Sequence, residues 1–139
     1  MNAINTVLLI GGFIVLFSVI ISMLESSKIL NLSSNMLAPI LSFLNIPLSF
    51  SNGIIAGIIE LTHGVSKIAL ISNQSIFKSI IVCAFLIGFG GISVSLQILS
   101  IISKANISIK PYIIGKLLQG ILAAVYTYLI ICFVPIFNL

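Results

Sequence analysis

Charge is scarce in this chain of 139 residues, and arginine is absent. Only 6% of the residues are charged: the basic ones are six lysines and the acidic ones are Glu25 and Glu60, which gives a net charge of +4. A nucleic-acid-binding surface is typically a basic patch with interleaved aromatic side chains and arginine forks. Nucleic acid is therefore not an expected partner. The lysines lie mostly near the ends of apolar runs, where they can snorkel or set membrane topology.

Residues that bind metals or form disulfides are also few. Cys83 and Cys132 both lie in apolar runs without a metal-type spacing, so we expect two free thiols. His63 follows Glu60 by three positions, a spacing that binds metals in some helical bundles. The chain has no second histidine, so we expect no metal or cofactor, and a hydrogen-bonded or solute-facing histidine instead. No set of nucleophile, base and acid and no phosphate loop is present, so an enzyme is not expected.

Apolar residues are abundant, at 60% of the chain, and the mean hydropathy is +1.36. A soluble domain of this size could not bury so much aliphatic surface. The long apolar segments are Thr6–Leu24, Ser51–Ser72, Ile76–Ile102 and Tyr112–Phe133, and about 20 residues suffice to cross a bilayer. A polar break at 25–35 precedes a short, interfacial segment, Met36–Ile46, which contains Pro39.

This pattern predicts an all-α membrane protein. We expect about four membrane segments, two of them interrupted or re-entrant, and one short interfacial helix. Residues 1–139 form a single membrane domain. Because no lysine or arginine precedes Thr6, the first segment predicts a retained helix and not a cleaved signal.

The second long segment carries a polar and small stripe at helical spacing: Asn52, Gly53, Ala56, Gly57, Glu60, His63, Gly64 and Lys67. The isoleucines at 54, 55, 58 and 68, with Leu61 and Val65, fall mainly on the other, lipid side. Gly53 and Gly57 allow close approach of another helix, and packing alone is the alternative reading. A carboxylate within the membrane is a candidate for solute or proton binding. Alternatively, Glu60 pairs only with Lys67 or His63.

The third long segment has glycine at positions 88, 90 and 91, which favours a break in the helix. A helix that restarts there directs its N–H groups and positive dipole end at an anion or a carbonyl-rich solute. Ser93, Gln97, Ser100 and Lys104 then form a polar stripe. The alternative is a packed kink with serines bonded back to the helix. In the last segment, Gln119 is expected to face the protein interior.

Three motifs resemble the C-terminal half of the sporulation integral membrane protein YlbJ family, within the nucleoside-recognition or Gate domain membrane proteins. They are Leu-Leu-Ile-Gly-Gly-Phe-Ile-Val-Leu-Phe-Ser-Val-Ile near the start, Gly57-Ile-Ile-Glu-Leu-Thr-His-Gly64, and Gly88-Phe-Gly-Gly-Ile-Ser-Val-Ser-Leu-Gln97. The resemblance implies a multi-pass protein, related to concentrative nucleoside carriers, that moves a small solute such as dipicolinate between mother cell and forespore. It places the chain in the cell membrane or the forespore membrane.

The resemblance also implies a set of site residues. Those that would line the transport site are Glu60, Thr62, His63, Gly90, Gly91, Ser93 and Gln97, with Asn52, Lys67 and Gln119 as possible support. Family members have two related halves, so this chain is a fragment, a split-gene product, or a half that pairs with another chain or a second copy. A membrane scaffold or assembly subunit without transport is the alternative function.

Three structural predictions follow from these patterns. Residues 88–91 interrupt the third helix. Four full crossings place Lys28 and the loop 104–110 on the cytoplasmic face with both termini opposite, an assignment that changes if a segment is re-entrant. The stripes Asn52–Lys67 and Ser93–Lys104 face each other across one polar cavity, because lipid cannot satisfy either stripe.

Overall fold

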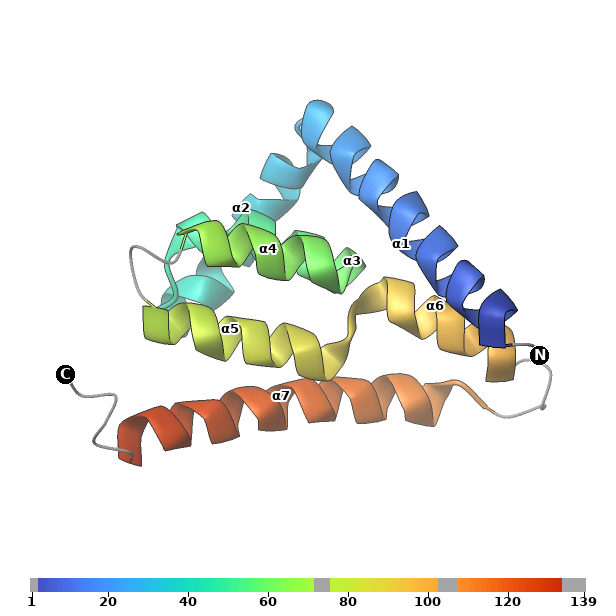
Figure 1. Cartoon of the computed structure of the whole chain (residues 1–139). Helices are drawn as coiled ribbons and strands as arrows, with labels where there is room; N and C mark the ends of the chain where they lie inside the picture. The colour runs from blue at the N-terminus through green and yellow to red at the C-terminus, as the bar shows by residue number, and fades with distance from the viewer. Residues whose placement is uncertain (1–2, 72–75, 103–107, 134–139) are drawn as a thin grey trace.

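The computed structural model describes residues 3–71, 76–102 and 108–133, with backbone alone at 31–34 and 100–102. All the elements in these ranges are helices, as the sequence predicts. Figure 1 shows α1 (Ala3–Ser26) and α2 (Ile29–Phe43) meeting at a corner, with the remaining helices below them. The protein is therefore an all-α membrane protein, since three of its segments are long and apolar enough to cross a bilayer.

The corner between α1 and α2 is a two-residue turn at Ser27 and Lys28. Lys28 adopts a left-handed conformation with φ of 59° and ends the run of α1. The predicted polar break at 25–35 is therefore too long, and the short segment predicted from Met36 is only the second part of α2. Tertiary packing explains the difference, because helices in proteins are stabilised mainly by burying one face. In α2 that face includes Leu30 and Leu41, which are both buried.

The second long segment is a hairpin of two short helices. After the turn η1 (Leu48–Phe50), α3 (Ser51–Ile59) runs inward, and α4 (Leu61–Ile71) returns beside it. A Cβ added to Gly64 would lie 2.1 Å from the Cα of Gly57, and one added to Gly53 would lie 2.7 Å from Cγ1 of Ile68. This antiparallel pairing makes the segment re-entrant. Helices of 9 and 11 residues are about 14 and 16 Å long, roughly half of the 30 Å hydrocarbon core.

The third long segment is α5 (Ile76–Phe89) followed by α6 (Gly91–Ile102). The predicted interruption is confirmed at Gly90 and Gly91, whose φ angles are +84° and +77°. Gly88 instead belongs to the last turn of α5. There it lets α7 (Lys110–Phe133) approach, because a Cβ on Gly88 would lie 2.9 Å from the Cα of Gly120.

The hairpin reduces the number of crossings to three: α1, the α5–α6 pair and α7. In Figure 1 the start of α1 lies beside the end of α6, and the end of α7 lies at the opposite end of the molecule. With three crossings, we expect Lys28 and the start of α7 on opposite faces of the bilayer. This replaces the arrangement predicted for four full crossings, which was expected to change if a segment is re-entrant.

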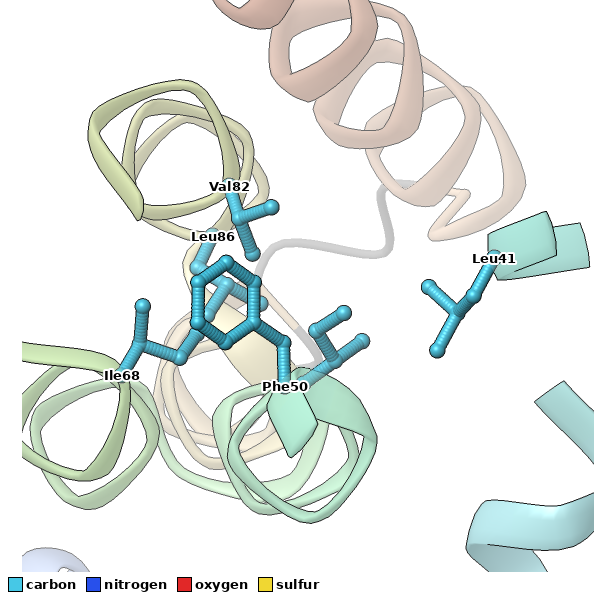
Figure 2. Packing of buried hydrophobic residues seen from close by; sticks show 6 residues of the cluster. Leu41, Phe50, Ile68, Val82 and Leu86 are labelled. Atoms are coloured by element: carbon cyan, nitrogen blue, oxygen red, sulfur yellow. The ribbon is translucent and has the colours of Figure 1, made fainter. Parts of the chain in front are cut away.

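The apolar core lies where the hairpin packs on α5 and the end of α2. Figure 2 shows Phe50 between Ile68 of α4 and the α5 residues Val82 and Leu86. Leu41 and Ile54 complete the buried cluster. Ile54 and Ile68, which the helical pattern assigned to the lipid side, are thus core residues, since the hairpin turns both towards α5.

Candidate functional site

The carboxylate of Glu60 caps the helix that follows it. Glu60 is only 2% exposed, and its backbone is extended (φ −141°, ψ 118°). The N–H of Thr62 donates to Oε1 over 3.0 Å, and the N–H of His63 donates to Oε2 over 2.8 Å. The hydroxyl of Thr62 also donates to Oε2, over 2.6 Å. The carboxylate thus satisfies the free N–H groups of α4 and lies at its positive dipole end.

The two chain breaks meet. A Cβ added to Gly91 would lie 3.1 Å from the carbonyl oxygen of Gly57, 3.4 Å from that of Ile58 and 3.4 Å from the amide nitrogen of Leu61. The first turn of α6 therefore contacts the tip of the α3–α4 hairpin directly. The negative C-terminal end of α3 faces the positive N-terminal end of α6, which is a favourable arrangement of helix dipoles.

The polar stripe of α6 begins at this junction. Ser93 and Gln97 are 1% and 8% exposed, and the amide of Gln97 donates to the hydroxyl of Ser93 over 3.3 Å. Neither side chain faces lipid. The hydroxyl of Ser95 donates to the carbonyl of Gly91 over 3.0 Å. This agrees with the alternative prediction of a packed kink with serines bonded back to the helix. The side chain of Ser100 and the whole of Lys104 lie outside the described residues.

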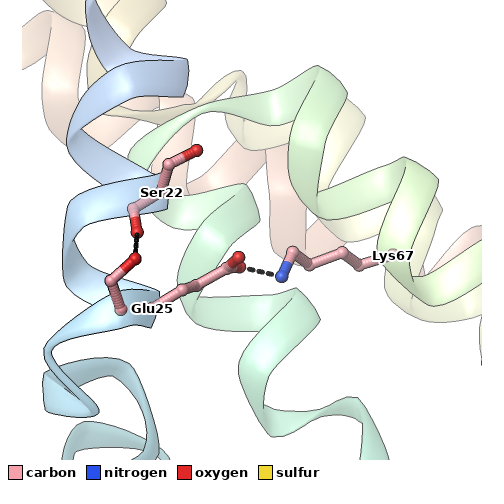
Figure 3. Close-up of polar contacts among 4 residues, drawn as sticks. Ser22, Glu25 and Lys67 are labelled. Atoms are coloured by element: carbon pink, nitrogen blue, oxygen red, sulfur yellow. Dashed lines mark hydrogen bonds and ion pairs between the residues drawn. The ribbon is translucent and has the colours of Figure 1, made fainter.

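Lys67 pairs with Glu25 and not with Glu60. Figure 3 shows the ammonium group of Lys67, on α4, reaching the carboxylate of Glu25 near the end of α1. Beside this pair, the hydroxyl of Ser26 donates to the carbonyl of Ser22 in the same helix. The sequence singled out Lys67 but missed Glu25, because the two residues lie 42 positions apart and meet only through the fold.

The stripe predicted from Asn52 to Lys67 is not one helical face. The helix reverses at Glu60, so residues on its two sides belong to different helices. Asn52 is half-buried on α3, whereas Thr62 is exposed and His63 half-buried at the start of α4. The glycines of the stripe do allow close helix approach, as predicted. Gly53 faces Ile68 in the hairpin's own second arm, whereas Gly57 faces Leu86 of α5.

The other predicted groups are dispersed. Gln119 is exposed on α7 and does not face the interior of this chain, contrary to the prediction. Cys83 and Cys132 are free thiols, as expected. Within the described ranges, no three side chains of His, Cys, Asp or Glu gather into a possible metal site.

Fold and site together define a multi-pass, all-helical membrane protein with two broken membrane segments in contact. The family model for the Gate domain, described as nucleoside recognition, matches residues 7–108, so the chain belongs to this family. Over 129 residues the chain is 33% identical to the sporulation integral membrane protein YlbJ of Bacillus subtilis (strain 168). The match covers 93% of this chain but only 31% of YlbJ, in its C-terminal part. No solved structure matches the chain.

Proposed function

We propose that this chain is one unit of a membrane carrier for a small polar solute. The observation that carries the proposal is the contact between the two chain breaks, where Gly91 abuts the carbonyls of Gly57 and Ile58. Transporters bind solutes near the bilayer midplane with broken helices of this kind. Irregular backbone at membrane depth is tolerated where protein or a water-filled cavity surrounds it. The family match supports a non-enzymatic membrane protein, in agreement with this role.

The residues proposed for the site have three roles: positioning the hairpin tip, contacting the solute, and forming the opposite wall. Glu60 positions the hairpin tip, because its carboxylate already accepts three hydrogen bonds from Thr62 and His63. The side chains of Thr62 and His63, which are not buried, then contact the solute from the tip. Gly90, Gly91, Ser93 and Gln97 shape the opposite wall, and Asn52 supports it from α3. We propose that the polar cavity lies between the hairpin tip and α6, in place of the cavity predicted between two continuous stripes.

The charge balance at the junction bears on the cargo. Glu60 occupies the positive N-terminal end of α4, and the negative C-terminal end of α3 faces the positive N-terminal end of α6. Lys67 is paired with Glu25, so each of these positive groups already has a negative partner. A dicarboxylate such as dipicolinate therefore needs cationic groups from the second unit of the carrier. A neutral polar solute needs none. We propose dipicolinate as the first cargo to test, with the chain acting during spore formation, because its relative is a sporulation protein.

Solute binding can be tested on the purified chain without a flux assay. In a variant without native cysteines, Thr62→Cys places a thiol at the exposed hairpin tip. In the chain alone, a nucleoside as the neutral probe is expected to slow its labelling by a maleimide at least fivefold. Dipicolinate is expected to do so in the native membrane, where the second unit of the carrier is present. Ser66→Cys, also exposed on α4 but one turn further from the tip, is the matched control. Equal labelling with and without every solute, in the chain alone and in its native membrane, would refute the proposal.

A membrane scaffold or assembly subunit is the second candidate. The observation in its favour is that Glu60 and Gln97 both bond within their own segments, as purely structural groups would. A scaffold predicts that Thr62→Val has no effect on spore dipicolinate content in the source organism, whereas Gly64→Ala, which disturbs packing, lowers it. A carrier predicts that both variants lower it.

A further inference from the structure

One flank of α7 carries an uncharged seam that nothing in the described chain covers. Its residues recur at alternating spacings of three and four: Gly115, Gln119, Leu122, Tyr126, Leu129 and Phe133. All of them are exposed, and Tyr126 is 62% so. The helix meets α5 through a different flank, where Gly120 is its only buried residue in the described range. A 3-4 spacing is the pattern with which one helix packs against another over several turns.

Gln119 makes this seam unsuitable for lipid. It lies near the middle of a helix of 24 residues, at the depth of the hydrocarbon core. A lipid tail offers its amide neither a donor nor an acceptor, and an unsatisfied polar group in an apolar medium costs several kcal/mol on transfer scales. Such side chains in membrane helices face protein, where they bond across helices. The seam is therefore a protein contact surface.

The seam fits a copy of itself. A primary amide has both donors and an acceptor, so two glutamines can bond to each other. No residue of the seam carries charge, so two copies meet without repulsion. At Gly115 an added Cβ would meet nothing within 4 Å in this chain, which leaves room for a second backbone. We propose that a second copy of this chain docks along α7, with Gln119 of one copy hydrogen-bonded to Gln119 of the other.

The proposal is tested by measuring dimerisation of the full chain in liposomes, with donor and acceptor fluorophores on separate copies, over a range of protein-to-lipid ratios. Gly115→Ile fills the space at the seam, at a position where an added Cβ meets nothing within 4 Å in its own chain. We expect it to lower the association constant about three- to tenfold, because small residues at such an interface let the two backbones approach closely. Gly12→Ile is the matched control, since Gly12 is equally open on α1. It should leave dimerisation unchanged.

A second variant tests whether the Gln119 amide, and not the overall hydrophobicity of α7, drives dimerisation. The double variant Gln119→Leu, Leu117→Gln keeps the amino-acid composition. It moves the amide to the opposite side of the helix, where Leu117 is 47% exposed. We expect the same loss of association, with unchanged helix content. A wild-type chain that stays monomeric at all ratios overturns the proposal. So does a dimer indifferent to both changes, or capture of a different membrane protein by α7 while the chain remains monomeric.

Discussion

Glu60 shows how a single side chain solves two problems at membrane depth. A buried carboxylate is costly unless hydrogen bonds satisfy it, and the first N–H groups of a helix need acceptors. Because the chain reverses at Glu60, both requirements are met within three residues. The same geometry explains why Glu60 contacts neither Lys67 nor solvent.

Replacing Glu60 with glutamine is expected to destabilise the hairpin tip by about 1–2 kcal/mol, the usual range for a helix cap that also faces the dipole. Hydrogen exchange at the amides of Thr62 and His63 should accelerate accordingly. Glu25→Gln is the control, because its partly exposed ion pair with Lys67 contributes about 1 kcal/mol or less. Equal effects of the two substitutions would contradict the capping role.

Gly64 is expected to be the glycine least tolerant of a side chain. In Gly64→Ala the new Cβ would meet backbone atoms of Gly57 at 2.1 and 2.3 Å, and backbone cannot yield as a side chain can. Overpacking of this kind costs about 1–3 kcal/mol or more. Gly12→Ala, in open space on α1, should be neutral or stabilising, since alanine is the better helix former. Unfolding of both variants in mixed micelles by titration with SDS measures the difference.

At the scale of elements, the two broken segments break for different reasons. The hairpin reverses because a side chain caps the second helix, whereas α5 and α6 separate because Gly90 and Gly91 adopt positive φ. Both breaks lie near the middle of an apolar run, so their ends come to similar depth and can touch. The α5–α6 segment is also the most enclosed of the three that can cross the bilayer. Of an 18-residue apolar stretch in each, 39% is buried in α5–α6, against 11% in α1 and 6% in α7.

Alanine at the two glycines of this break should have graded effects. Gly90→Ala meets only Val94 at 3.7 Å, so its cost is that of the left-handed backbone, about 1–2 kcal/mol. Gly91→Ala bears a similar cost and adds a contact of 3.1 Å to the carbonyl of Gly57. Loss of stability should therefore be larger at Gly91, as measured by thermal unfolding in detergent. The reverse order would mean that α6 does not rest on the hairpin tip.

At the scale of the whole molecule, the re-entrant hairpin fixes which loops share a side. Three crossings are expected to place the α1–α2 corner and the start of α7 on opposite faces of the bilayer. The corner carries Lys28, and the α6–α7 connection leads into Lys110. The chain corresponds to about a third of the length of its relative, so α1 and α7, which are mostly exposed, are the surfaces available to other subunits.

Labelling of single cysteines from one side of sealed vesicles tests this topology. Ser27→Cys and Ser108→Cys are both at exposed positions, in a background without the native cysteines. A membrane-impermeant maleimide added outside should label only one of the two, and permeabilisation should reveal the other. Labelling of both from the same side would show that the hairpin crosses the membrane.

The sequence by itself determined the membrane setting, the helical class and the place where the third long segment breaks. Hydropathy and glycine content are local properties, so the interruption at Gly90 could be predicted without a fold. Tertiary structure alone decided the reversal at Glu60, the pairing of Lys67 with Glu25 and the burial of Ile54 and Ile68. The apolar pattern of the second segment is the same whether the helix runs straight on or turns back at Glu60. Only the contact between Gly57 and Gly64 shows that the chain has turned back, because a straight helix would not bring these two backbones together.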